Sequence, residues 1–187
     1  HDNSGADGGA IMCNASNTTI TNCTIVGNND TQLSGLNSSG ILVHTGNTSF
    51  TILNSIIWDN VINFDDYDGG TLNISYSDIE GGESGILLSD NNTGTLNWGE
   101  ANFDVDPLFC DINEGDYTLY GNSPLLGSGL DDENIGAYGE GCLSYLGPVW
   151  HVSVLGSDNN DGNENSPFAS IQKGIDYADE GDTILVG

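Results

Sequence analysis

Basic side chains are almost absent from this sequence. One Lys or Arg stands against 28 Asp and Glu in 187 residues, which gives a formal net charge of −27. A nucleic-acid-binding surface needs cations to neutralise phosphates, and an anionic membrane repels a chain of this charge. We therefore expect no nucleic-acid partner.

Long hydrophobic runs are also lacking, because no stretch approaches the roughly 18 apolar residues of a membrane-spanning helix. We therefore expect no membrane insertion. The residues after His1 show neither the basic region nor the apolar core of a signal peptide, and the chain does not begin with Met. This pattern favours a processed product or a piece of a longer protein.

Hydrophobic residues make up only 36% of the chain, and low hydrophobicity with high net charge is typical of disorder. Their arrangement argues against disorder. They form short runs rich in β-branched residues, such as residues 41–43, 56–58 and 184–186, and Gly, Asn, Asp or Ser bounds each run. This punctuation indicates strands and turns, so we predict an ordered, all-β chain.

Internal repeats indicate how the strands are arranged. Residues 8–29 align with residues 39–60, and a third copy covers residues 73–82. The first match places residues 9–12 on residues 40–43. After a one-residue slip, the matched positions across the copies are Ile20, Ile52 and Ile74; Cys23, Ser55 and Ser77; Ile25, Ile57 and Ile79; and Asn28 and Asn60. A fourth partial copy starts at Gly85, and the period of 22 to 32 residues predicts a β-solenoid.

In such a fold the coils pair in parallel, apolar residues stack inward, and Gly, Asn, Ser and Thr occupy the corners. Asn22 and Asn54 recur at one register. They are therefore candidates for a ladder of side-chain amides, and the alternative is a pair of solvated turn residues.

The repeat GGAIMCNASNTTITNCTIVGNN, at residues 8–29, resembles the repeats of right-handed parallel β-helix proteins of the pectate-lyase-like superfamily. It is especially similar to secreted and surface proteins with polymorphic-outer-membrane-protein-like repeats. Residues 103–142 are similar to the closing segment of such β-helices, with DPLF, GDYTL and IGAYG elements. The resemblance implies an all-β, right-handed parallel β-helix with one short capping helix near the C-terminus.

Residues 149–187 are similar to the opening of many β-helix proteins, which use a cap helix before a GDTI-type strand. Ser166 suits a helix cap and Pro167 the first helical position, and an apolar stripe follows at Phe168, Ile171, Ile175 and Ala178. We predict two domains. Residues 1–147 hold solenoid coils and their closing segment, and residues 148–187 hold a cap helix and the first strand of a following or neighbouring solenoid.

This order is unusual, because the chain closes one solenoid and then opens another. It fits a window from a longer tandem array, or copies that assemble head to tail into a fibre; an arbitrary boundary is the third possibility. The expected partners are further copies or further modules of the same chain. The expected assembly residues are Trp150, Phe168, Ile171, Ile175, Ile184 and Val186.

Catalysis is not expected. Lyases of the resembled superfamily use Ca²⁺ with an Arg or Lys base, and its hydrolases surround Asp residues with His, Arg and Lys. Lys173 is the only basic candidate here, and it lies on the predicted cap helix. His1, His44 and His151 are far apart in the sequence and show no ligand spacing. We predict no catalytic residues.

Calcium is the expected ion, because hard cations neutralise a dense surface of carboxylates and amides. The favoured loop offers oxygen ligands from Asp158, Asn160, Asp161 and Glu164. For each acidic cluster the alternative is a solvated turn. The other clusters are Asp65, Asp66 and Asp68; Asp104 and Asp106; Asp111, Glu114 and Asp116; and Asp131, Asp132 and Glu133.

Four cysteines allow three pairings into two bridges. The resemblance implies a Cys110–Cys142 disulfide, because such a pair occurs in the family's closing segment. Cys13 and Cys23 lie within one repeat and form either a second bridge or inward-facing thiols. Disulfides imply an oxidising compartment, so we expect an extracellular or cell-surface protein.

Sugars enter the sequence interpretation in two ways. Trp58, Trp98 and Trp150 are candidates to stack on glycans, although packing is the alternative role. Asn-x-Ser/Thr sequons mark glycosylation candidates at Asn14, Asn17, Asn29, Asn37, Asn47, Asn73 and Asn91.

The function we predict is a non-catalytic structural or adhesive module. The alternative is a carbohydrate-active or carbohydrate-binding β-helix.

Overall fold

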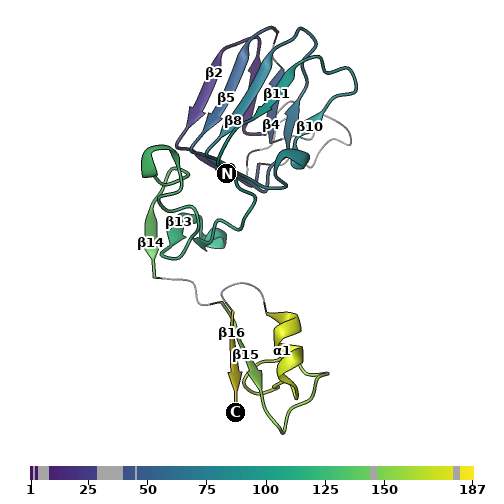
Figure 1. Ribbon diagram of the computed structural model, residues 1–187, viewed down its shortest axis with the longest axis vertical. Coiled ribbons are helices and arrows are strands. Elements are labelled where there is room, and N and C mark those ends of the chain that lie inside the picture. The colour runs from purple at the N-terminus through teal and green to yellow at the C-terminus, as the bar shows by residue number, and fades with distance from the viewer. Residues whose placement is uncertain (2, 4–8, 29–39, 45, 144–146, 179–181) are drawn as a thin grey trace. The chain divides into compact units, whose positions relative to one another are not determined.

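The computed structural model describes residues 1, 3, 9–28, 40–44, 46–143, 147–178 and 182–187. The chain forms two compact units, His1–Leu143 and Ser144–Gly187 (Figure 1). Most of the secondary structure consists of strands in parallel sheets, with one α-helix, which confirms the all-β prediction.

Three parallel sheets build most of the first unit (Figure 1). The chain enters the sheets in turn, so that every third strand pairs in parallel with the one before. The first sheet contains β1 (Ile11–Asn14), β4 (Ile41–His44), β7 (Ile62–Phe64) and β10 (Leu87–Leu88). The second contains β2 (Thr18–Thr21), β5 (Ser49–Leu53), β8 (Thr71–Ser75) and β11 (Thr95–Trp98). The third contains β3 (Thr24–Val26), β6 (Ile56–Trp58) and β9 (Asp78–Ile79).

The register of the second and third sheets confirms the repeats found in the sequence. Ile20 pairs with Ile52, which pairs with Ile74. In the third sheet, Ile25 pairs with Ile57, which pairs with Ile79. The sequence alignment therefore identified the pairing of β2, β5 and β8 and that of β3, β6 and β9.

The expected register of the first sheet is wrong by one residue. Ile11 pairs with Ile41 rather than with Leu42. The cause is the connection after β4, which is two residues longer than the connection after β1, as the pairs Asn14–His44 and Thr18–Phe50 show. The alignment allowed for a slip of one residue, whereas the structure has a slip of two.

Side chains of one register row stack to form the core. Phe50 lies over Leu72, and Val43 lies beside Phe64 in the first sheet; all four are fully buried. Burial of such a side chain is worth about 1.5–3 kcal/mol. The ordered stacking explains how a chain with few hydrophobic residues supports a core.

The corners between the strands use left-handed backbone. In each of three rows the residues have positive φ and recur at equivalent positions of successive coils. Gly, Asn and Asp adopt this conformation most readily, which explains their abundance. The rows are Ala15, Asn47 and Gly69; Asn22, Asn54, Tyr76 and Ala101; and Gly27, Asp59 and Gly81.

A ladder of side chains links the coils directly after the second of these rows. The hydroxyl of Ser55 accepts the backbone N–H of Cys23 at 3.1 Å, and the hydroxyl of Ser77 accepts that of Ser55 at 3.2 Å. Asn102 continues the ladder by accepting the N–H of Ser77 at 3.2 Å. Each coil thereby satisfies a backbone donor of the preceding coil.

A closing segment follows the coils. It contains the small sheet of β12 (Phe109–Asp111), β13 (Asp116–Tyr120) and β14 (Glu140–Cys142), tied by the Cys110–Cys142 disulfide. A second apolar cluster, Ile56, Leu119, Leu125 and Ile135, joins this segment to the third sheet. Three 3-10 turns complete the unit: η1 (Glu83–Gly85), η2 (Ile112–Glu114) and η3 (Leu130–Asp132).

The second unit pairs β15 (Val149–Val152) in parallel with β16 (Thr183–Val186), and α1 (Ile171–Tyr177) packs on both strands. The expected helix start is wrong, because Ser170 rather than Ser166 is the N-cap and accepts the N–H of Lys173. Phe168 is extended instead: its N–H donates to the carbonyl of His151 at 2.9 Å. This strand-like pairing holds residues 166–169 out of the helix.

Candidate functional site

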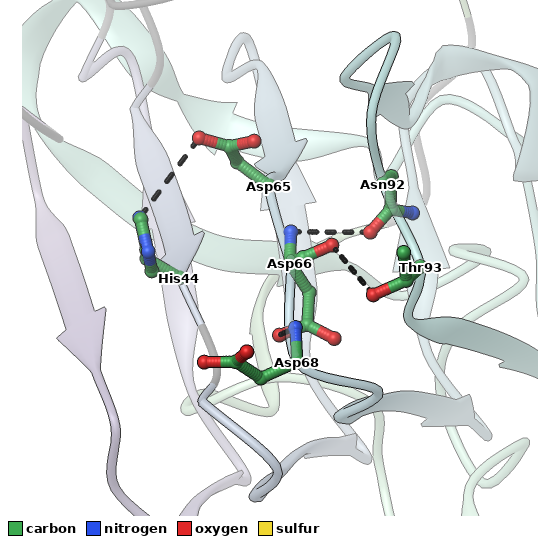
Figure 2. Close-up of polar contacts among 6 residues, drawn as sticks. All are labelled: His44, Asp65, Asp66, Asp68, Asn92 and Thr93. Atoms are coloured by element: carbon green, nitrogen blue, oxygen red, sulfur yellow. Dashed lines mark hydrogen bonds and ion pairs between the residues drawn. The ribbon is translucent and has the colours of Figure 1, made fainter.

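An acidic corner lies where β4 and β7 end (Figure 2). His44 is the last residue of β4, and Asp65 directly follows β7. Because parallel strands end at one edge, the two side chains meet, with 3.9 Å between His44 Nδ1 and Asp65 Oδ2. Both are partly exposed, so a charged His44 adds little to stability.

Asp66, within the same corner, is structural. It is fully buried, and its carboxylate accepts the backbone N–H groups of Gly70 and Asp68. Its backbone N–H donates to Asn92 Oδ1 at 3.1 Å, and its carbonyl accepts the Thr93 hydroxyl at 3.4 Å (Figure 2). The same carbonyl accepts the backbone N–H of Thr93 at 2.7 Å. One of the three carboxylates predicted as calcium ligands is thus used to hold the turn.

The other side chains of the corner, those of His44, Asp65 and Tyr67, are polar and at least partly exposed. The ring of Tyr67 lies 5.5 Å from that of His44, and the adjoining Asp65 carboxylate raises the pKa of the Tyr67 phenol. Within the described part of the chain, no three His, Cys, Asp or Glu side chains are grouped to hold a metal ion. The corner offers hydrogen-bonding groups and negative charge.

The loop favoured for calcium closes on itself. Asp158 accepts the backbone N–H groups of Ala169 and Ser170, and the Ser170 hydroxyl donates to it at 2.8 Å. These bonds, led by that of the Ser170 hydroxyl, lower the pKa of Asp158. The side chain of Asn160 donates to the carbonyl of Pro167 at 2.8 Å. Two of the four expected ligands therefore stabilise the loop itself, while Asp161 and Glu164 are exposed.

Other acidic clusters serve as turn caps. In each case a carboxylate oxygen accepts a backbone N–H about two residues ahead or from a neighbouring coil, which is the ordinary role of Asp in turns. The carboxylates concerned are Asp104, which binds Gly81; Asp106, which binds Leu108; Asp111, which binds Asn113 and Glu114; and Asp116, which binds Thr118.

A buried carboxyl group, Asp78, was missed by the sequence analysis. It is fully buried on β9, and its Oδ1 accepts the N–H of Val105 at 3.1 Å. Burial and, to a smaller extent, the charges of Asp104, Asp106 and Glu80 raise the pKa of Asp78 to about 7, while the hydrogen bond from the Val105 N–H opposes this shift. In the sequence it resembles any surface acid, because only the folded closing segment covers it.

A second missed feature is a shallow pocket of about 400 Å³, lined by Asn22, Asp132, Glu133, Asn134, Gly136, Ala137, Tyr138 and Gly139. Here the expected amide ladder proves wrong. Asn22 and Asn54 both donate to Glu133 Oε2, at 3.3 and 3.5 Å. The closing loop places this carboxylate between two coils, and no repeat pattern signals such a contact.

The cysteines divide into one disulfide and two thiols. Cys110 and Cys142 are bonded, with 6.1 Å between their Cα atoms. A Cys13–Cys23 bridge is wrong, because both are free. Cys13 is buried in the core beside the Thr18 hydroxyl, and the thiol of Cys23 donates to the Thr21 carbonyl. The alternative of inward thiols fits Cys13.

Each tryptophan packs against apolar or aromatic residues of its own unit. Trp58 packs on the second apolar cluster and Trp98 on the main core of the first unit. In the second unit Trp150 stacks on Phe168, with 5.9 Å between ring centroids. Each of the three is partly buried by packing.

The glycosylation candidates differ in accessibility. Asn14, Asn17, Asn47 and Asn91 are exposed. Asn73 is half-buried on β8 and accepts a hydrogen bond from the Asn97 amide at 2.8 Å, which disfavours modification there. Asn29 and Asn37 lie outside the described residues.

The six expected assembly residues fall into two groups. Trp150 and Phe168 form the interior of the second unit, and Ile184 packs there against Gly174. Ile171, Ile175 and Val186 are 51%, 53% and 55% exposed. Only the second group presents an apolar surface.

No family model matches the chain, and its comparison with curated proteins and with solved structures gives no match. Among the described residues, no helix is long and apolar enough to cross a membrane.

Proposed function

We propose that the chain is a non-catalytic extracellular structural or adhesive module, built as a right-handed parallel β-helix. The observation that carries this proposal is the cyclic entry of the chain into three parallel sheets with stacked corners. In a solenoid, each coil of the chain contributes one strand to each sheet. The connections between parallel strands of one sheet are right-handed in nearly all proteins. The resemblance to pectate-lyase-like β-helices agrees with this topology.

The rigidity of such a module supports a structural role. Long-range stacking fixes every coil against its neighbours, and a Lys/Arg-poor surface suits neither nucleic acid nor an acidic polysaccharide substrate. The Cys110–Cys142 disulfide is compatible with an oxidising, extracellular location. Sugar binding through the three tryptophans loses support, because packing partly buries each of them.

End-to-end continuation is part of the proposal. In the described structure β16 pairs only with β15, and β1, β2 and β3 each pair with a single neighbour. Strands with a free edge accept further strands. The half-exposed Ile171, Ile175 and Val186 supply an apolar surface beside one such edge, so a further copy or module of the same kind is the expected neighbour.

Analytical ultracentrifugation and electron microscopy of the full chain test this continuation. We expect concentration-dependent head-to-tail oligomers, which Ile175→Asp weakens. Leu155→Asp is the matched control, because Leu155 is an exposed aliphatic of the same unit on a loop.

A chain that stays monomeric at every concentration overturns the non-covalent version. Two copies joined in one polypeptide then test the covalent version. We expect the junction to raise the unfolding temperature of the first copy's second unit. Two copies that unfold like independent single chains overturn it.

A further inference from the structure

The pocket beside Glu133 is walled by a loop that is firmly fixed to the coils. The backbone N–H of Leu130 donates to Asn54 Oδ1 at 2.8 Å, and that of Gly136 donates to the Asn54 carbonyl at 2.8 Å. The N–H of Ala137 donates to the Thr24 hydroxyl at 2.9 Å. These bonds join the loop to two successive coils, so the pocket is preformed.

The pocket lining is negatively charged and contains no cationic side chain. Asp132 and Glu133 contribute carboxylates, and residues 1–143 contain no Lys or Arg. The partners of Glu133 are the neutral amides of Asn22 and Asn54, which orient its carboxylate without cancelling the charge. A cation entering the pocket therefore gains coulombic energy, and no Lys or Arg of the unit competes for the carboxylates.

An aromatic ring lies in the same lining. Tyr138 is 50% exposed, and tyrosine rings attract ammonium and guanidinium groups through their π faces. A hollow of about 400 Å³ exceeds a single metal ion, and the described residues include no group of three metal-ligating side chains. An organic cation uses the carboxylates, the ring and the volume together.

We propose that this pocket binds the guanidinium or ammonium group of a basic side chain on a partner protein. Asp132 and Glu133 pair with the positive charge. The ring of Tyr138 covers the apolar part of the basic side chain or stacks on its guanidinium group, and Asn22 forms a hydrogen bond at the rim of the pocket. This proposal goes beyond the structural module and is independent of end-to-end continuation, because a monomeric solenoid retains the whole pocket.

Nuclear magnetic resonance titration of the full ¹⁵N-labelled chain tests the proposal. The probe is the peptide acetyl-Gly-Arg-Gly-amide, and the matched neutral probe replaces Arg with citrulline. We expect the arginine peptide to shift the resonances of Asn22, Tyr138 and the loop residues, and the citrulline peptide to bind at least about tenfold more weakly. Added salt weakens arginine binding.

Charge-removing variants with conserved shape locate the site. Asp132→Asn suits the positive φ of 59° at that position, and Glu133→Gln keeps an oxygen that accepts from Asn22 and Asn54. Each change is expected to weaken binding by about two- to fivefold, and Tyr138→Leu by a similar factor. Glu83→Gln and Tyr67→Leu are the controls, since both remove exposed groups outside the pocket and leave binding unchanged.

Three results with the peptides overturn the proposal. They are equal binding of the arginine and citrulline peptides, shifts that persist in the Asp132→Asn/Glu133→Gln double variant, and no shift with the arginine peptide. A neutral disaccharide that shifts the same resonances more strongly than the arginine peptide also overturns it and assigns the pocket to a glycan.

Discussion

The two units of the chain are stabilised in different ways. In the first unit, core side chains of successive coils stack in register, and eleven of the twelve largest fully buried side chains of the described chain lie there. The second unit contributes only Phe168 to that set and leaves several aliphatic side chains more than half exposed, among them Ile171, Ile175 and Val186. The first unit therefore has its own core, whereas the second depends on one aromatic cluster and gains from a covering neighbour.

Truncation of a core side chain is expected to give the largest change in the free energy of unfolding. Phe50→Ala removes a fully buried ring over Leu72 and should cost the first unit about 3–5 kcal/mol in the free energy of unfolding. Urea titration followed by far-ultraviolet circular dichroism measures the loss. A first unit that tolerates Phe50→Ala with less than about 1 kcal/mol of loss contradicts the stacked core.

The same truncation in the second unit sharpens the contrast. Phe168→Ala removes the ring that contacts both Trp150 and Tyr177, so the second unit should unfold while the first stays folded. The near-ultraviolet dichroism of Trp150 reports its loss. Leu155→Ala, a change at an exposed position of the same unit, is the control and should leave that signal intact.

The disulfide tests how the closing segment is held. Replacing Cys110 and Cys142 by Ser opens a loop with a sequence separation of 32 residues, which should destabilise the first unit by about 3–4 kcal/mol. The second unit should not respond. Thermal unfolding with and without reductant checks the wild-type chain, and equal stability of both forms would mean that apolar packing alone holds the segment.

Asp78 makes the first unit sensitive to pH. Its pKa is about 7 in the folded chain, above the ordinary value of 3.8, so the folded chain holds the proton more tightly between these values. The stabilising contribution is therefore complete below about pH 4 and is lost as the pH rises through 7. Asp78→Asn should reduce this slope and raise stability at pH 8 by about 2 kcal/mol.

Urea titrations at a series of pH values compare Asp78→Asn with Asp90→Asn, which removes an exposed charge that is not among those raising the pKa of Asp78. The other carboxylates contribute a common background slope, so the difference between the two variants isolates the buried group. Identical slopes would show that Asp78 titrates as a surface acid.

Repetition decided how much of this structure was readable from the sequence. The rows of Ile20, Ile52 and Ile74 were visible because a stacked core reuses one residue type at one register. The short strands β7 and β11 were missed. Ile62–Phe64 carries Asn63 at its centre, and although Thr95–Trp98 repeats the first three residues of β8, the repeat alignment did not extend to it. Local signals located the corners but not their exact length, which explains the one-residue error at Ile11.

The candidate sites were less predictable because they arise where the closing segment meets the coils. Glu133 lies far along the chain from Asn22, and Asp78 is buried only when Val105 covers it. No spacing rule links such pairs. In the second unit, Ser166 and Pro167 are a plausible helix start by local propensity, and tertiary pairing of Phe168 with His151 overrode it.

Side-chain hydrogen bonds give a smaller test of the same contrast. Ser77→Ala leaves the buried N–H of Ser55 without its acceptor and should cost the first unit about 1–3 kcal/mol. Ser170→Ala removes the cap of α1 and should cost the second unit about 1 kcal/mol. Ser84→Ala, at an exposed turn, is the control for urea titration and should change stability by less than about 0.5 kcal/mol. Equal losses at Ser77 and Ser84 would contradict the ladder.

Calcium should have the smallest effect, and only on the second unit if the loop at Asp158 is its site. Asp158 and Asn160 already bind the loop's own groups, so an ion would gain mainly from Asp161 and Glu164 and bind weakly. Saturating calcium should then stabilise the second unit by about 1 kcal/mol over a chelator-treated sample, and Asp161→Asn should remove that gain.

Calorimetry resolves the unfolding of the two units. A shift confined to the first unit would place the ion among its acidic turns instead, and no shift in either unit would show that the −27 charge is tolerated without bound calcium.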